Sequence, residues 1–456
     1  MRTMRISRSA MWRRSRAMVN SRRLWKTRLV FWLGALAIGA IGAGFAIAAD
    51  YAQEFFARYV LPGAGGWLVL AVAPLGFALS ALIVNLWFPG AQGSGIPQAI
   101  AARHLRDDPR RGGLLTLRII FGKIFLTVFG LACGASIGRE GPTVQVGASI
   151  MAQAARIGNL AHRRGLILAG SAAGIAAAFN TPLAGIVFAI EEMSRAYQAR
   201  TNGLVLSTVI IAGLSSLGIL GSYTYYGISK EVAHLPADLP LVLVCGLGGG
   251  VFGALFSRLV ISTTRRIRRF KGMGPRRRAM IIAGTAGLVT ALVGLACGGE
   301  VFGTGYAQAR AAVEGETLSI SFFIGKFVTT LAATVSGIPG GLFAPSLSVG
   351  AGLGAALGAL LGSSIGLAAI LGMAGYFAGV TQAPMTAFVI IFEMTGNHDD
   401  VIAIMAAAML GYGTSRIIQP EPLYHALSRL FIADALRARR AAAQPPKPRE
   451  EAPPSA

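Results

Sequence analysis

Several apolar segments of this chain are long enough to cross a lipid bilayer as helices. A membrane-spanning helix needs about 17 to 25 mainly apolar residues, and residues 29–49, 66–88, 241–257 and 279–297 meet that requirement. Only 13% of the residues are charged, whereas a soluble domain carries about 25%. The remaining apolar stretches are shorter or are broken by Gly and Pro, which lipid tolerates only where neighbouring protein satisfies the freed backbone groups. We therefore predict an all-α polytopic membrane protein with many tilted, broken helices.

The placement of the charges predicts how the chain is oriented. The net charge of +23 comes from 42 basic and 19 acidic residues. Ten Lys or Arg lie in residues 2–28 and nine more in residues 258–278, and neither segment contains an acid. Basic residues beside spans mark the cytoplasmic side, whereas residues 221–239 and 299–317 contain acids and few bases, as outside loops do. Because topology accounts for the basic charge, no nucleic-acid partner is indicated.

These observations divide the chain into five segments. We expect a basic cytoplasmic N-terminal segment (1–28), a first transmembrane repeat (29–220), an external connecting loop (221–239), a second and inverted repeat (240–435) and a cytoplasmic tail (436–456). The tail is rich in Pro and charge, so we expect disorder there. The basic region before the first span is long and no small-residue cleavage pattern follows it, so we expect that span to be retained and not removed as a signal peptide.

The two halves of the chain resemble each other in sequence. With a shift of 203 residues, residues 138–148 align without gaps on 341–351, five positions are identical, and Lys123 falls on Lys326. At a shift of 202, Glu191 falls on Glu393. Because the first half begins inside and the second begins outside, the repeat is inverted. An inverted repeat places a substrate site near the midplane between the two halves, at the N-termini of broken helices.

Four segments share one pattern, in which Gly or Pro interrupts an apolar region and a new helix begins. They are GSGIP at 93–97, GREGP at 138–142, GIPGGLFAP at 337–345 and PEPLY at 420–424. They offer mainly donors, including backbone N–H groups and the hydroxyls of Ser94 and Tyr424, so the predicted ligand is an anion. Each break could instead be a packing kink. Ser94 alone could be an N-cap, and Tyr424 alone could be an interfacial residue.

Two glutamates lie where an ionisable group is costly. Glu140 follows a Gly/Pro break, so its carboxylate could occupy an anion position and leave it on protonation. Glu192 ends an apolar helix and could accept protons from the cytoplasm, although a surface ion pair with Arg195 is the alternative. Arg139 and Lys123 are expected to be structural, through neighbouring side chains or carbonyls. The three Cys and five His residues lack metal-ligand spacing, so no metal, cofactor or catalytic residue is predicted.

The motifs at 93–97, 122–123, 138–142, 180–193, 340–345 and 422–424 occur in the order of the CLC family of chloride channels and proton-coupled chloride transporters, which the chain resembles over residues 30–435. The resemblance implies a homodimer in a bilayer with one anion pathway per subunit, in the inner membrane of a bacterium and with cytoplasmic termini. It also implies a chloride site with these members: Ser94, Gly95, Leu342, Phe343 and Tyr424. By the same similarity, Glu140 is the external gate.

Proton-coupled members of that family carry an internal glutamate where this chain has Glu192. The resemblance therefore implies exchange of protons for chloride, with a passive gated chloride channel on the same fold as the alternative. Gln98 stands where family members often have Glu, and Ile100 follows in an apolar run, so the internal proton route could differ in detail. A cation transporter would need further midplane acids, and an enzyme would need a nucleophile with a base; neither pattern is present.

Overall fold

A computed structural model describes residues 22–105, 111–158, 163–194, 202–221, 225–227, 232–234, 236–270, 272–397 and 399–443. Within these ranges the chain is helical, and the only strand-like pairing is an isolated bridge between Gly138 and Gly341. The first half contains α2 (Arg22–Phe55), α3 (Val69–Trp87), α4 (Ile96–His104), α5 (Arg111–Leu114), α6 (Leu117–Ala132), α7 (Glu140–Ile157), α8 (Arg163–Phe179), α9 (Pro182–Phe188) and α10 (Asn202–Leu220). The short π-helices η1 (Phe56–Val60) and η3 (Ala189–Ser194) continue α2 and α9, and η2 (Gly63–Gly66) is a 3-10 helix.

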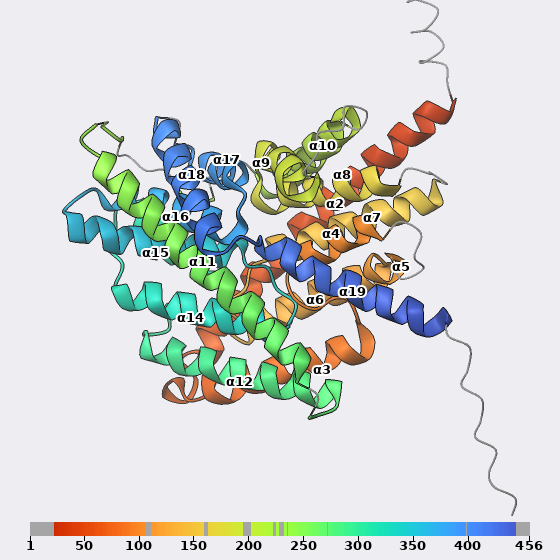
Figure 1. Cartoon of the computed structure of the whole chain (residues 1–456), viewed down its shortest axis with the longest axis horizontal. Helices are drawn as coiled ribbons and strands as arrows, with labels where there is room; N and C mark the ends of the chain where they lie inside the picture. Colours follow the sequence, from red (N-terminus) through yellow and green to blue (C-terminus); the bar gives the residue numbers. More distant parts are fainter. Residues whose placement is uncertain are drawn as a thin grey trace, which may run out of the picture.

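The second half continues as a similar series of helices. It contains α11 (Leu239–Arg269), α12 (Pro275–Ala296), α13 (Tyr306–Val313), α14 (Ile320–Ser336), α15 (Phe343–Leu361), α16 (Ile365–Thr381), α17 (Pro384–Thr395), α18 (Val401–Ile418) and α19 (Leu423–Ala443). In Figure 1 most of the red-to-yellow helices of the first half lie on one side of the molecule and most of the green-to-blue helices of the second half on the other, whereas α19, drawn in blue, runs beneath the helices of the first half and contacts α4. The two halves are in contact where α3 of the first half packs against α12 of the second half.

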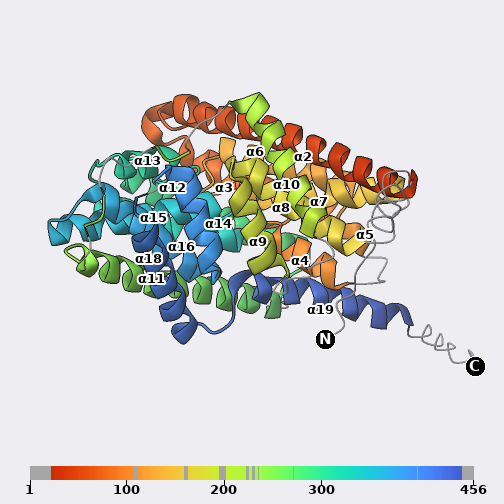
Figure 2. The same ribbon diagram turned by 90° about the horizontal axis from the view of Figure 1, so that it is seen from above.

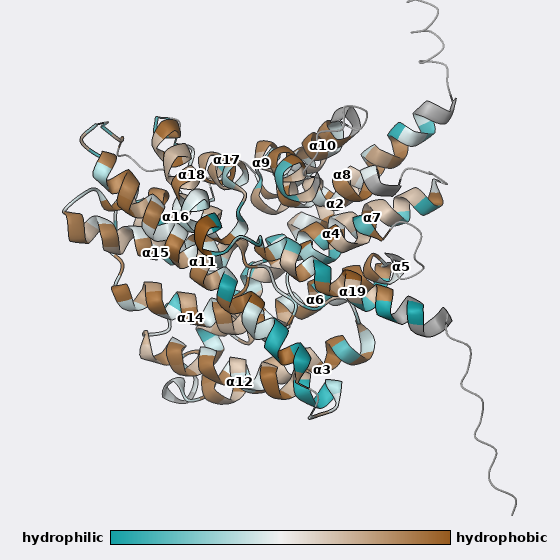
Figure 3. Cartoon of the chain, in the orientation of Figure 1, coloured by the Kyte–Doolittle hydropathy of each residue, from teal (hydrophilic) through white to brown (hydrophobic). Residues whose placement is uncertain are grey.

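The predicted spans are confirmed as long apolar helices. Residues 29–49, 66–88, 241–257 and 279–297 fall in or around α2, α3, α11 and α12, each of which is long and apolar enough to cross a membrane. Figure 3 shows mostly hydrophobic residues on these helices, whereas hydrophilic residues gather on α19 and the nearby ends of α11 and α12. The broken helices are also confirmed, since α4 has 9 residues and α17 has 12, too few to span a bilayer.

Small residues allow helices within each half to pack at close range. A Cβ on Gly147 of α7 would overlap the carbonyl oxygen of Gly170 on α8. In the second half, a Cβ on Gly350 of α15 would likewise overlap the carbonyl oxygen of Gly372 on α16. Helices in lipid associate by such close packing of small residues. The repeat predicted from the sequence thus extends to the details of helix contact.

The two halves exchange helix caps. The Glu191 carboxylate accepts the N–H groups of Met385 (3.1 Å) and Thr386 (2.6 Å) at the start of α17. Reciprocally, the Glu393 carboxylate accepts the N–H groups of Leu183 (3.0 Å) and Ala184 (2.7 Å) at the start of α9. A carboxylate at a helix N-terminus satisfies donors that lack intrahelical partners and interacts favourably with the helix dipole. Glu191 and Glu393, which the sequence repeat aligns, therefore have the same structural role: each caps a helix of the other half.

The chain ends differ from the predicted boundaries. α2 begins at Arg22, inside the segment predicted as a basic extension to residue 28, and residues 1–21 lie outside the described part. α19 continues to Ala443, past the predicted start of a disordered tail at residue 436. The reason is composition, since residues 436–443 are Leu, Arg and Ala, which are strong helix formers. Figure 2 shows α19 along one edge of the molecule and α2 along the opposite edge.

Candidate functional site

All four predicted breaks are confirmed as starts of new helices. α4 begins at Ile96, α7 at Glu140, α15 at Phe343 and α19 at Leu423. The breaks before α7 and α15 are joined directly, because Gly138 and Gly341 exchange two backbone hydrogen bonds of 2.7 Å. The break before α4 joins the same group, since the Gly340 N–H donates to the Gly93 carbonyl at 3.2 Å. Backbone hydrogen bonds thus bring three broken helices from both halves to one place.

The hydroxyls of Ser94 and Tyr424 lie close to each other at this place. Ser94 is 7% exposed and Tyr424 is fully buried, and neither hydroxyl has a hydrogen-bond partner of good geometry among the described residues. The Ser94 hydroxyl packs against Gly141 at the start of α7, where any Cβ would overlap it. Buried hydroxyls are costly to leave unbonded, so these two donors are available to a ligand.

Two backbone positions predicted for the site lie at the start of α15. Leu342 is the N-cap of that helix and Phe343 is its first residue, and both are buried. The first N–H groups of a helix have no intrahelical acceptor, so they face the space before the helix. The Phe343 ring lies 6.0 Å from the Tyr424 ring and 4.8 Å from the Phe377 ring, measured between centroids. Aromatic packing therefore holds the start of α15 beside Tyr424.

Gly95 lies at the start of α4, next to Ser94. It is the N-cap of α4 with φ of 101°, a backbone conformation that favours glycine. Its carbonyl accepts the Ala99 N–H at 3.0 Å, as the N-cap of a helix does. The structure thus brings Ser94, Gly95, Leu342, Phe343 and Tyr424, all predicted from the sequence, to helix starts around one point.

The Glu140 side chain reaches from the first half to the second. It is fully buried, and its Oε2 accepts the Ala344 N–H at the start of α15 at 3.4 Å. The same oxygen lies over Gly138, where a Cβ would overlap it. The Glu140 carboxyl group therefore occupies the N-terminal end of α15, the kind of position that favours anions.

Arg139 and Lys123 make the structural contacts that the sequence predicted. Arg139 donates to the Ala46 carbonyl and to Asp50 Oδ1, both at 2.9 Å. Lys123 is fully buried and donates to the carbonyls of Ala91 (2.8 Å) and Gly93 (2.6 Å). Its repeat partner Lys326 holds the 301–303 loop in the same way. Both lysines thus stabilise loops that precede broken or short helices.

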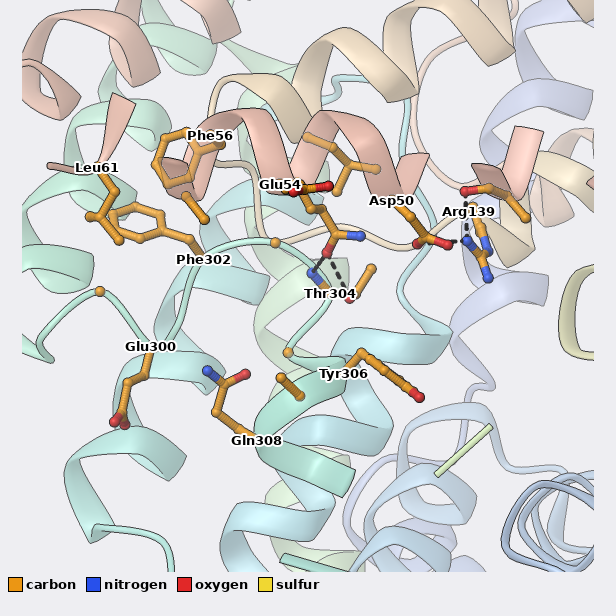
Figure 4. A pocket seen from close by; sticks show the side chains of 18 of the residues that line it. Asp50, Glu54, Phe56, Leu61, Arg139, Glu300, Phe302, Thr304, Tyr306 and Gln308 are labelled. Atoms are coloured by element: carbon orange, nitrogen blue, oxygen red, sulfur yellow. Dashed lines mark hydrogen bonds and ion pairs between the residues drawn. The ribbon is translucent and has the colours of Figure 1, made fainter. Parts of the chain in front are cut away.

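A cavity of about 610 Å³ lies next to Arg139. Figure 4 shows Asp50 and Glu54 of α2 on one wall and Glu300 and Gln308 on the other, with the Asp50–Arg139 ion pair at one end. Asp50 is 64% exposed at its side chain, whereas Arg139 is 5% exposed. The residue directly after Arg139 is Glu140, so this cavity ends near the Glu140 gate candidate.

Glu192 is buried and lies near Tyr424. It is 2% exposed, so it is not a surface residue, and Arg195, its alternative ion-pair partner, lies outside the described residues. His425 Nε2 lies 3.8 Å from Glu192 Oε1 and 3.2 Å from the Glu192 carbonyl oxygen. The sequence showed only that the five histidines lack metal-ligand spacing, so this contact was not predicted. The signal available was the position of His425 directly after Tyr424.

Gln98 is a buried residue that ties α4 to the loop before it. Its amide donates to the Gly90 carbonyl at 3.4 Å and to the Gln92 carbonyl. Ile100, two residues along α4, is fully buried in the apolar core. Since the carboxamide cannot release a proton as a carboxyl can, Gln98 acts here as a structural donor.

Comparison with known proteins places this arrangement in a family. The sequence model described as "Voltage gated chloride channel" matches residues 75–416, which is most of the chain. The chain belongs to the CLC family. As a family member it is an integral, multi-pass membrane protein with the inverted-repeat fold predicted from the sequence, and the resemblance stated on its motifs is confirmed. Within the described ranges, no group of three or more His, Cys, Asp or Glu side chains is placed to hold a metal ion.

Several relatives of this CLC protein have descriptive names. It is 31% identical to the H(+)/Cl(-) exchange transporter ClcA of Yersinia pestis bv. Antiqua, over 91% of this chain and 90% of that protein. It is also 31% identical to ClcA of Citrobacter koseri, over 88% of each. Among solved structures, a slow cyanobacterial Cl-/H+ antiporter superposes with a TM-score of 0.77 at 26% identity, covering 90% of this chain and 98% of that one.

Proposed function

We propose that this protein exchanges protons for chloride across a membrane. The observation that carries the proposal is the Glu140 carboxylate at the start of α15, bonded to the Ala344 N–H. A chloride ion at that position would need the same backbone donors, so carboxylate and chloride compete for them. Protonation removes the charge of Glu140 and opens the position, which links one proton to the movement of an anion. Relatives named as H(+)/Cl(-) exchangers support this reading.

The donors around the break predict a chloride site. Ser94 and Tyr424 contribute two buried hydroxyls, and the starts of α4 and α15 add backbone donors near Gly95, Leu342 and Phe343. A bound cation would require converging carbonyl or carboxylate oxygens, whereas helix N-termini attract anions. In the proposed site, chloride is held between the hydroxyls of Ser94 and Tyr424 and these backbone N–H groups, beside the competing Glu140 carboxylate.

The proposed orientation places both termini in the cytoplasm of a bacterium, with the protein in the inner membrane. The basic end of α11 is fixed to α19 by ion pairs, Arg265 to Glu421 at 2.6 Å and Arg268 to Asp434 at 2.8 Å. If the basic loop after α11 is cytoplasmic, as its charge predicts, then α19 lies on that side as well. Glu192 and His425 then belong to the cytoplasmic half of the proton route, and the cavity beside Arg139 to the external half.

We also propose a homodimer built through α9, α10, α17 and α18. These helices expose a set of large apolar side chains, namely Leu183, Leu206, Ile210, Leu214, Met385, Ile402, Met405 and Met409. The reciprocal caps formed by Glu191 and Glu393 lie on this same face and are only partly buried. Because carboxylates facing lipid are costly, covering this face with a second copy stabilises it.

The test of exchange is a flux measurement in proteoliposomes that records chloride and external pH together. An outward chloride gradient should drive protons uphill, against their own gradient, and the direction should reverse when the chloride gradient is reversed. Chloride flux without any proton movement would overturn exchange and establish the alternative, a passive channel on the same fold.

A further inference from the structure

Glu192 is too deeply buried to exchange protons directly with water. Its side chain is 3% exposed, and it lies in η3, against α8, α9 and α17. A group that accepts protons from the cytoplasm needs a partner that reaches both the solvent and the carboxylate. This inference rests on the proposed exchange function and concerns how protons reach Glu192.

His425 meets both requirements. Its side chain is 17% exposed, and its Nε2 lies 3.2 Å from the Glu192 carbonyl oxygen and 3.8 Å from Glu192 Oε1. The contact with the carbonyl oxygen is a hydrogen bond. A small rotation of either side chain, or one bridging water, would connect the imidazole to the carboxylate oxygen as well. His425 is the third residue of α19, the helix whose basic contacts with α11 place it at the membrane surface. The imidazole therefore lies between the carboxylate and the edge of the protein.

We propose that His425 is the cytoplasmic proton-entry residue, which passes protons between bulk water and Glu192. When protons move from the cytoplasm to the outside, the His425 imidazolium gives its Nε2 proton to a Glu192 carboxylate oxygen. This leaves a neutral imidazole and a neutral carboxyl group. The imidazole then takes a new proton from cytoplasmic water and is ready for the next turnover. Imidazole suits this step because it changes charge between about pH 5 and 8.

The charged groups around His425 favour a relay over a fixed ion pair. The helices that contact α19 carry these titratable or charged side chains: Arg103 and His104 on α4, Arg258, Arg265, Arg266, Arg268 and Arg269 on α11, and Tyr376 on α16. Next to the His425 ring lies Glu192 of η3, which also carries Glu191, and α19 and the residues before it add Glu421, Arg429, Asp434 and Arg437. Glu421 accepts hydrogen bonds from both Arg265 and Arg429, and Asp434 pairs with Arg268. Glu421 and Asp434 are thus held by arginines, and the carboxylate that lies beside the His425 ring is that of Glu192.

The experiment compares His425→Gln with the wild type in proteoliposomes, with chloride and proton fluxes recorded in the same sample. Glutamine keeps a neutral donor and acceptor but cannot carry a proton at these pH values. Proton flux should fall about tenfold or more, as expected for losing a positioned acid–base group, while chloride flux stays near wild type. His104→Gln is the matched control, since His104 is the last residue of α4, a helix that packs against α19, and its ring contacts the Ile100 carbonyl. Proton coupling in that variant should be unchanged.

Chemical rescue separates a relay from a structural role. In His425→Ala, millimolar imidazole on the cytoplasmic side should restore proton flux with a dependence on internal pH that follows the added base, which lost packing would not produce. Wild-type coupling retained in His425→Gln would overturn the proposal while leaving exchange intact, and uncoupled wild-type protein would overturn exchange itself. If neither variant assembles, the test uses a protein that keeps His425 as its one histidine. In it the other four are replaced by Gln: His104, His162, His234 and His398. Carbethoxylation of its remaining imidazole should stop proton flux and spare chloride flux, and unchanged proton flux would refute the relay.

Discussion

The hydroxyls of Ser94 and Tyr424 allow a quantitative test of the anion site, because both are buried beside each other and neither has a hydrogen-bond partner of good geometry among the described residues. The substitutions Ser94→Ala and Tyr424→Phe each remove one oxygen and leave the surrounding packing nearly unchanged. A hydrogen bond to a charged group contributes about 1.5–3 kcal/mol, and a factor of ten in affinity corresponds to about 1.4 kcal/mol. Each variant should therefore weaken chloride binding by about tenfold or more.

The double variant should lose less than the product of the two single effects. Both hydroxyls are proposed to bind the same ion, and the contributions of neighbouring groups are not additive. Backbone donors at Gly95 and Phe343 remain, so some affinity is retained. In the chloride-free protein the same substitutions should not weaken the protein, because there is no bound ion to lose. Removing an unsatisfied buried hydroxyl relieves a penalty of about 1–3 kcal/mol, so thermal stability without chloride should be unchanged or higher.

Calorimetric titration of purified protein with chloride measures the affinity, and thermal unfolding with and without chloride measures the stability. Tyr376→Phe is the matched control, because the Tyr376 hydroxyl is also buried and unbonded but its ring packs against Phe256 and Phe327. Its chloride affinity should equal that of the wild type. Unchanged affinity in both Ser94→Ala and Tyr424→Phe would remove these hydroxyls from the site and refute the reasoning.

Three further predictions concern charged groups. Glu140→Gln should keep chloride flux but lose proton coupling and most of the pH dependence of flux, measured in proteoliposomes; intact pH dependence would place the gate elsewhere. Glu192→Gln should abolish uphill proton pumping with substantial chloride flux left, whereas Glu191→Gln should keep coupling while losing about 1 kcal/mol of stability by thermal unfolding, as expected for a weakened cap; a pumping Glu192 variant would contradict the assignment. Lys123→Met should destabilise the fold by about 2–6 kcal/mol, because two buried carbonyls lose their donor, and a melting temperature equal to that of the wild type would contradict this.

The sequence predicted the site wherever a residue type determines its own local structure. Gly and Pro breaks mark helix starts because proline fits the first helical turn without wasting a hydrogen bond, and the starts of α4, α7, α15 and α19 followed from them. The structural role of Lys123, through neighbouring side chains or carbonyls, was also predicted from the sequence. The carbonyls that it binds also lie in the Gly-rich loop that the sequence marked as a break.

Contacts between residues far apart in the chain could not be predicted. Glu140 binds Ala344 across 204 positions, which depends on the rotamer of one side chain and on how the halves are docked. The repeat paired Glu191 with Glu393, but a sequence alignment shows equivalence and not the exchange of caps between them. His425 was missed for the same reason, since its partner Glu192 lies 233 positions away and the sequence gives no spacing to connect them.

The exchanged caps also have a consequence for biogenesis. While the ribosome is still making the second half, α9 is already in the membrane, and the N–H groups of Leu183 and Ala184 await the carboxylate of Glu393. Unbonded donors in lipid are costly, so the first half must remain incompletely assembled until residue 393 has been synthesised. Either half produced alone should be recognised as unfinished and degraded. Two halves produced as separate chains in one cell should instead rescue each other, because each carries the group that completes the other.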